Sequence, residues 1–167
     1  INIFLHFSKD LQKKHFVMTD GTESSKNIIA KINLNGPIFN NNSNVFGNNF
    51  YDYIDPAKVK SYLEELKQLK INTLIININT PGGTVSATAE LEQIIYKFKK
   101  ETNTKVYFFT KEILASGGYW VATTGDKIFA SYGSIIGSIG VSGPSWFYYN
   151  TPLSLSSGVF GLSLIHI

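Results

Sequence analysis

Residues 114–120 read Leu-Ala-Ser-Gly-Gly-Tyr-Trp, and the rest of the chain is organised around this stretch. The apolar run Val106–Phe109 leads toward it, and a helix of small residues, from Ser116 to about Thr124, is expected to leave it. A serine between a strand and the first turn of a helix can serve as a nucleophile, because the helix N-terminus favours negative charge nearby. The two glycines that follow let a substrate backbone approach closely. Ser-Gly-Gly turns are also common in purely structural positions, so a second feature is needed to indicate function.

That second feature is the turn Thr80-Pro81-Gly82-Gly83, which follows the apolar strand expected at 74–78 and also opens a helix. In an open parallel sheet, ligands bind where strands end and helices begin. The two turns follow successive strands, so we expect them to lie side by side. Together they can supply a nucleophile and two backbone N–H groups aimed at one oxygen, as an oxyanion hole requires. Neither turn has the spacing of a dinucleotide-binding or P-loop motif.

The composition limits the remaining possibilities. With 167 residues the chain is long enough for one domain with a hydrophobic core. The net charge is +3 and the basic residues are scattered, so nucleic acid is not an expected partner. The absence of cysteine excludes a disulfide framework, a thiolate nucleophile and a cysteine-based zinc site. The chain has no acidic cluster or histidine pair that indicates a metal, and no cofactor is expected.

Strands and helices alternate along the chain, which predicts an α/β fold with a mostly parallel sheet and right-handed crossovers. Asp55-Pro56 supplies an N-cap followed by proline at the first helical position. Strands are predicted at 28–34, 74–78, 106–109 and 128–130, helices at 56–70, from 84 or 86 to 100 and from 116 to 124, and a loop or strand at 134–141.

Four motifs in this order resemble the signal peptide peptidase A family: Asn79–Gly83, Ala115–Tyr119, Asp126–Ile128 and Gly137–Val141. The resemblance covers about residues 28–141. It implies the Clp-protease/crotonase fold, with repeated β-β-α units, and a membrane-associated bacterial serine peptidase. Its expected substrates are remnant signal peptides or other membrane-proximal polypeptides, and its expected assembly is a homo-oligomeric ring.

The same resemblance implies a Ser–Lys dyad, with Ser116 as the nucleophile and the N–H groups of Gly83 and Gly117 as the oxyanion hole. The general-base lysine of the family lies roughly fifty residues beyond the nucleophile, and it activates serine only when it is neutral and buried. That position falls at or just past the end of this sequence, so we expect the base to be missing from it. Lys111 and Lys127 are weaker candidates.

The ends of the chain have their own interpretation. We expect residues 1–27 to be a lead-in, polar and weakly patterned after Phe7, that can be the end of a membrane anchor, and residues 28–161 to be a truncated peptidase domain. No run of about 18 apolar residues forms a complete membrane span. Residues 162–167 match the translation of a common sequencing adapter and are set aside.

An acyl-CoA enzyme and an inactive scaffold are the alternative functions, and a histidine-based peptidase is disfavoured. A Ser-His-Asp triad places a histidine about twenty-five residues past the serine, but the only histidines are His6, His15 and His166. An acyl-CoA enzyme of the crotonase type shares the paired turns but needs no serine at position 116. A catalytically inactive scaffold uses Ser116 only as a helix cap.

Other polar and aromatic residues have two interpretations each. Ser138 either orients the absent lysine or bonds local backbone. Tyr119 and Trp120 are expected mainly to pack the nucleophile helix onto the sheet and secondarily to line a substrate pocket. The aromatic run Trp146–Tyr149 indicates a surface for subunit or membrane contact.

Overall fold

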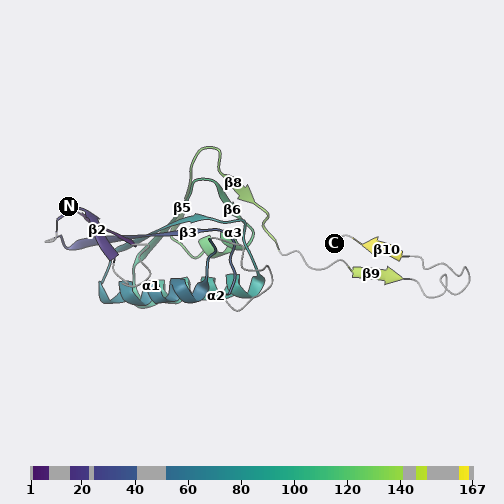
Figure 1. Cartoon of the computed structure of the whole chain (residues 1–167), viewed down its shortest axis with the longest axis horizontal. Coiled ribbons are helices and arrows are strands. Elements are labelled where there is room, and N and C mark those ends of the chain that lie inside the picture. Colours follow the sequence, from purple (N-terminus) through teal and green to yellow (C-terminus); the bar gives the residue numbers. More distant parts are fainter. Residues whose placement is uncertain are drawn as a thin grey trace, which may run out of the picture.

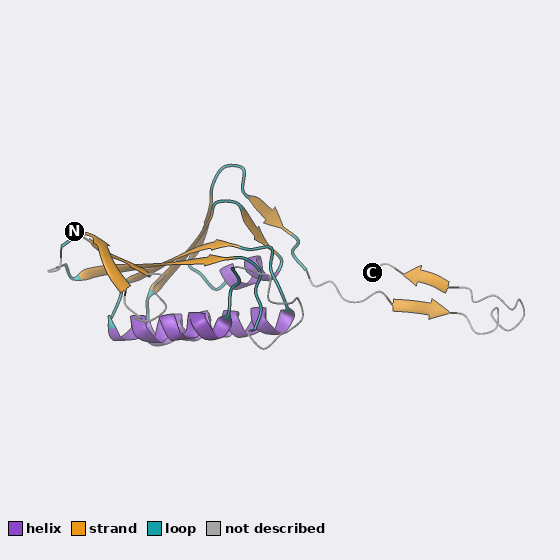
Figure 2. Cartoon of the chain, viewed as in Figure 1, coloured by secondary structure: helices purple, strands orange, loops and turns teal. Residues whose placement is uncertain are grey.

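The fold is built on one six-stranded sheet with its helices on one face (Figures 1 and 2). This computed structural model describes residues 2–7, 16–22, 25–40, 52–140, 146–149 and 162–165, and side chains within 19–22, 25–40 and 52–140. The strand order is β2-β1-β3-β4-β5-β7. Their bounds are Asn2–Phe7 (β1), Phe16–Asp20 (β2), Asn27–Asn35 (β3), Thr73–Asn79 (β4), Lys105–Thr110 (β5) and Lys127–Ala130 (β7).

Every pairing in this sheet is parallel except that of β1 with β2. The predicted α/β class with a mostly parallel sheet is therefore confirmed. The expectation of an unpatterned lead-in after Phe7 is wrong at Phe16–Asp20, which forms β2 against β1. The physical reason is pairing with the preceding strand: a short segment with aromatic and β-branched residues becomes a strand when a partner edge is available.

The helices begin where the sequence predicts. The Asp55 side chain accepts a hydrogen bond from the Ala57 N–H (3.0 Å) and caps α1, Pro56–Gln68. The Thr84 side chain caps α2, Val85–Thr102, by accepting from the Ala87 N–H (3.4 Å). A third, short helix, α3, spans Gly117–Ala122 and packs against α2.

The core lies between the sheet and the helices. Alternate residues of β4 point into it, so that Leu74, Ile76 and Ile78 are fully buried. They meet buried side chains of α1 and α2: Val59, Leu63, Leu66, Leu91, Ile95 and Phe98. The opposite face of the sheet is more polar, and there the Asn77 amide donates to the Asn33 side-chain oxygen (2.9 Å).

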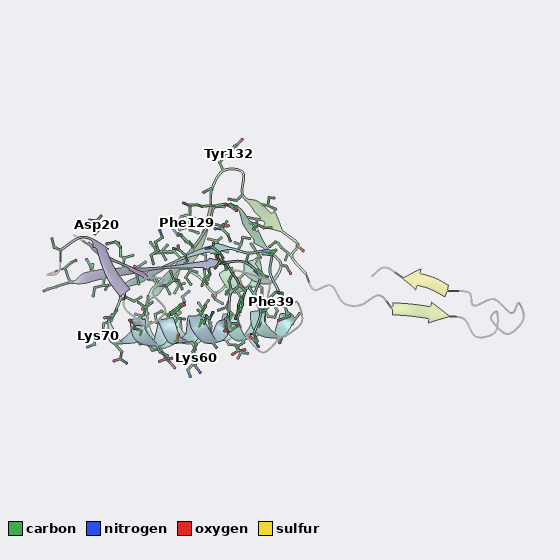
Figure 3. The ribbon with its side chains drawn as sticks, viewed as in Figure 1. Asp20, Phe39, Lys60, Lys70, Phe129 and Tyr132 are labelled. Carbon is green, nitrogen blue, oxygen red and sulfur yellow. The ribbon has the colours of Figure 1, made fainter. Side chains whose placement is uncertain are left out.

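Two smaller ladders complete the described structure. Strand β6, Ile113–Ala115, pairs in parallel with β8, Ile135–Gly137. Strand β9, Trp146–Tyr149, pairs antiparallel with β10, Leu162–Ile165. Between β7 and β8 the chain forms an exposed loop with Tyr132 at its tip (Figure 3). The β9 backbone is described but its side chains are not, so the predicted aromatic contact surface lies outside the described residues.

Candidate active site

The two glycine-rich turns lie against each other, as expected. The Thr80 N–H donates to the Ile113 carbonyl (2.8 Å), and the Ala115 N–H donates to the Thr80 carbonyl (3.1 Å). These bonds join the end of β4 to β6, the strand that leads directly to Ser116. A Cβ atom added to Gly82 would lie 2.9 Å from the Gly117 nitrogen, so the turns are in backbone contact.

Ser116 has a backbone conformation that is unusual for an L-residue. Its φ is 51° and its ψ is −125°, and it stands directly before α3. Its N–H donates to the Gly137 carbonyl of β8 (3.1 Å), and its carbonyl accepts from the Trp120 N–H (3.1 Å). Strained conformations of this kind cost stability and are concentrated at active sites. The two backbone bonds hold the residue in this strained state.

The Ser116 side chain does not cap α3. This finding removes the structural role that a serine before a helix usually has. The side chain is half-buried, and its hydroxyl makes no hydrogen bond to any residue whose side chain or backbone the structure describes. The helix cap that the scaffold interpretation expected of Ser116 is therefore not formed.

Gly83 and Gly117, whose N–H groups are the expected oxyanion hole, line the same pocket as Ser116. Gly83 is exposed, whereas Gly117 is buried. Within the described residues neither N–H donates a hydrogen bond to another backbone group, and the N–H groups of a first helical turn have no partner inside their helix. Side chains are excluded at both positions, because a Cβ at Gly83 would overlap the Ile38 carbonyl and one at Gly117 would overlap Thr88.

Ser116, Gly83 and Gly117 all line one pocket of about 480 Å³. Its wall is largely apolar and comes from α2, α3 and the segment after β8. The remaining lining residues are Val85, Thr88, Tyr119, Trp120, Thr123, Ile139 and Gly140. Tyr119 also packs against the core, which is the main role predicted for it, whereas Trp120 is 39% exposed and shows only the secondary predicted role of lining the pocket.

Asn79 ties the first turn to the segment that precedes the nucleophile. Its side-chain oxygen accepts three hydrogen bonds, from the Thr110 hydroxyl (3.1 Å) and from the N–H groups of Lys111 and Glu112 (3.0 Å each). Its amide donates to the Asn35 side-chain oxygen (3.4 Å). One side chain thus fixes β4 relative to the connection between β5 and β6.

Asp126 performs a similar structural task at the far end of the sheet. Its carboxylate accepts from the Val106 N–H (2.8 Å), and its own N–H donates to the Val106 carbonyl (2.7 Å). The hydrogen bond from Val106 lowers the pKa of the Asp126 carboxyl, and ion pairs with Lys99 and Lys105 lower it further. The Asp-Lys-Ile motif therefore anchors β7 to β5.

Neither candidate base lies at the pocket. Lys111 and Lys127 are both exposed, and neither lines the wall that contains Ser116.

Ser138 is also exposed, with a left-handed φ of 51°, and its hydroxyl bonds no group in the described part of the chain. The side chains of His6, His15 and His166 lie outside the described residues. Where side chains are described, no group of His, Cys, Asp or Glu residues could hold a metal ion.

Comparison with known proteins shows which family the chain resembles. Residues 98–155, which include the Ser116 turn, match the model of Peptidase family S49. The chain is a relative of the S49 peptidases. It is 30% identical over 146 residues to a putative signal peptide peptidase SppA of Enterococcus faecium, an alignment that covers 84% of this chain and 39% of that protein. The expected resemblance to the signal peptide peptidase A family is confirmed.

Of two shorter matches, one is to a protease and the other is to an antiporter. Protease 4 of Salmonella typhi is 32% identical over 74 residues, which cover 44% of this chain and 12% of the protease. An Na(+)/H(+) antiporter NhaA of Brucella melitensis is 41% identical over 71 residues, but these cover only 10% of the antiporter. The chain thus spans well under half the length of these S49 and antiporter relatives.

Solved structures show the fold. A membrane-bound stomatin-specific protease, 1510-N, in complex with a substrate peptide superposes with a TM-score of 0.55 at 21% identity, over 70% of this chain and 47% of that chain. Another variant of the same protease gives a TM-score of 0.53 at 18% identity and covers 83% and 56%. The Clp/crotonase-like fold is therefore confirmed, including a β-β-α unit formed by β5, β6 and α3.

Proposed function

We propose that the protein is a serine endopeptidase in which Ser116 is the nucleophile and the N–H groups of Gly83 and Gly117 form the oxyanion hole. The observation that carries this proposal is Ser116 itself. Its backbone is strained, its side chain caps no helix, and it lines a largely apolar pocket together with Gly83 and Gly117. The S49 match includes this turn and supports the same function.

In the proposed mechanism the general base takes the proton of the Ser116 hydroxyl while its oxygen attacks the scissile carbonyl carbon, and the carbonyl oxygen becomes an oxyanion. The two glycine N–H groups face the developing charge and stabilise it more strongly than the neutral carbonyl. The leaving amine takes a proton from the general base, and water then hydrolyses the acyl-enzyme. We propose that the base is a lysine outside the described residues, because neither Lys111 nor Lys127 lines the pocket.

We further propose remnant signal peptides and other membrane-proximal polypeptides as substrates. The apolar pocket wall suits the side chains of such segments, and the Enterococcus relative is named a putative signal peptide peptidase. A location at the bacterial membrane is proposed because the structural neighbour is described as membrane-bound. No helix in the described ranges has both the length and the hydropathy that crossing a bilayer requires.

A homo-oligomer is proposed for the whole protein. The loop and strand after β7 expose several large apolar side chains: Tyr132 (108% exposed), Ile135 (65%) and Ile139 (74%). Contiguous exposed apolar residues usually mark an interaction surface. Contact between copies through the loop and strand after β7 would cover these apolar side chains and would also enclose the neighbouring pocket.

The test uses the full-length protein with and without Ser116→Ala. We expect the parent to cleave apolar peptides and to react covalently with a fluorophosphonate probe, and the variant to lose both properties by several orders of magnitude. Ser61→Ala is the matched control, since the Ser61 hydroxyl donates to the Lys58 carbonyl (2.8 Å) on α1, away from the pocket. Turnover retained in the Ser116 variant would show that another residue is the nucleophile.

A further inference from the structure

Thr88 carries a buried hydroxyl that has no partner. The residue lies in α2, is 1% exposed, and lines the pocket that contains Ser116. Within the part of the chain that the structure describes, its Oγ1 makes no hydrogen bond. A buried hydroxyl without a partner costs stability, so such a group calls for a specific explanation.

Other threonines within or directly after a helix bond its preceding turn, as Thr88 does not. The hydroxyl of Thr102 donates to the Phe98 carbonyl (2.7 Å), and that of Thr124 donates to the Val121 carbonyl (2.8 Å). Thr123, which lines the same pocket, donates to the Trp120 carbonyl (2.6 Å). Bonding of this kind to the preceding turn is the usual local solution for threonine. The Thr88 hydroxyl makes no such hydrogen bond to the preceding turn of its helix.

The Thr88 hydroxyl faces the nucleophile turn instead. A Cβ atom added to Gly117 would overlap the Thr88 hydroxyl oxygen and would lie 2.9 Å from its methyl carbon. Gly117 is the residue directly after Ser116. The hydroxyl is therefore placed beside the point where an acyl group on Ser116 would begin, at the inner end of a wall that is otherwise apolar.

We propose that Thr88 is a specificity-determining residue that hydrogen-bonds the side chain of the substrate residue whose carbonyl Ser116 attacks. This inference rests on the proposed function. That side chain branches one atom from the scissile carbonyl, so its first polar atom arrives close to Gly117. The pocket then favours serine or threonine at this position over alanine or valine. Because the Thr88 hydroxyl is covered in the empty pocket, the proposal requires the wall beside Gly117 to shift when the ligand enters.

Product peptides provide a test that needs no catalysis. A short apolar peptide that ends in Ser, with a free carboxylate, is compared with the same peptide ending in Ala, because the C-terminal residue of a product occupies the position in question. We expect the parent protein to bind the Ser peptide about five- to tenfold more tightly, the usual effect of one net hydrogen bond. Thr88→Val should bring this ratio to about one, and Thr88→Ser, which keeps the hydroxyl, should preserve it.

Thr123→Val is the matched control, because it removes a hydroxyl from the same pocket that is already bonded to its own helix. It should leave the Ser-to-Ala ratio unchanged. A ratio near one in the parent, or a ratio that survives Thr88→Val, would overturn the proposal. So would an equal change in the affinities of both peptides, since a merely structural role acts on both alike.

The melting temperature gives a second, independent readout. Because Thr88→Val removes a hydroxyl that lacks a partner, the variant should melt at the same temperature as the parent or higher. A clear decrease would show that the hydroxyl already has a hydrogen-bond partner and would contradict the proposal.

Selective binding that depends on Thr88 without any cleavage would refute the peptidase function and leave Thr88 as a residue that binds the ligand. Cleavage that requires Ser116 but does not depend on Thr88 would support the peptidase function and refute the specificity role of Thr88.

Discussion

Gly82 and Ser116 lie so close together that a Cβ atom on Gly82 would stand 2.8 Å from the Cβ of Ser116. Carbon atoms without a bond between them do not approach this closely without displacement. The two turns therefore behave as one unit, in which the position of the proposed nucleophile depends on the absence of a side chain 34 positions earlier in the sequence.

Replacement of Gly82 by alanine tests this coupling. Gly82 has a φ of 97°, so alanine there costs about 1–2 kcal/mol from backbone strain alone. The clash with Ser116 adds to this cost, and we expect peptide hydrolysis to fall about 100-fold, as a misplacement of about 1 Å can cause. Chemical denaturation and initial rates on one peptide measure the two effects.

Gly133→Ala is the control for Gly82→Ala. Gly133 also has a positive φ, 86°, but nothing lies within 4 Å of the position that its Cβ would occupy. It should show the loss of stability that comes from backbone strain and keep hydrolysis within about twofold of the parent, since no catalytic group moves. Equal losses of activity in the two variants would contradict the coupling of Gly82 to Ser116.

The strain at Ser116 predicts an order of stability among its own variants. Glycine adopts a φ of 51° without steric cost, whereas alanine does not. We expect Ser116→Gly to be more stable than Ser116→Ala by about 1–3 kcal/mol, the usual range for a sparsely populated backbone region. Both variants should be inactive. Urea denaturation of the pair decides the matter, and equal stability would mean that position 116 is unstrained in solution.

Asn79 should be the most sensitive polar residue of β4. In Asn79→Ala the hydroxyl of Thr110, a fully buried residue, loses its acceptor, as do two backbone N–H groups. We expect a loss of about 1–3 kcal/mol in the free energy of unfolding. Asn77→Ala, on the same strand and face, breaks a single side-chain bond to Asn33 and should cost less. An equal loss of unfolding free energy in Asn77→Ala would contradict the expectation that the three hydrogen bonds to Asn79 stabilise the fold more than the single bond of Asn77.

The lowered pKa of Asp126 predicts how its contribution depends on pH. A carboxyl whose pKa is lower in the folded state contributes stability above its unfolded pKa of about 3.9, and this contribution disappears as the pH falls through the folded pKa. The stability difference between the parent and Asp126→Asn should therefore be constant near neutral pH and shrink below about pH 4. Thermal melts at several pH values measure it. A difference that grows on acidification would mean that the sign of the shift is wrong.

The sequence predicts the elements whose signals are local. Asp55-Pro56 marks the start of α1 because a cap and a proline act within one turn, and the alternation in β4 reflects burial of a single face. Strand β2 escapes prediction because its weak pattern forms a strand only where the edge of β1, the preceding strand, is available. Thr88 escapes as well, since its importance comes from contact with Gly117, 29 positions away, and from a hydrogen bond that it does not make.

The conformation of Ser116 also affects which substitutions are expected at this position during evolution. A serine that is held at positive φ lowers the stability of the fold, so it is retained only where its hydroxyl is used. In a lineage that no longer hydrolyses peptides, replacement by glycine restores stability and, from some serine codons, requires a single nucleotide change. Among proteins with this fold, we therefore expect glycine at the nucleophile position to mark members that have given up catalysis and kept only the scaffold.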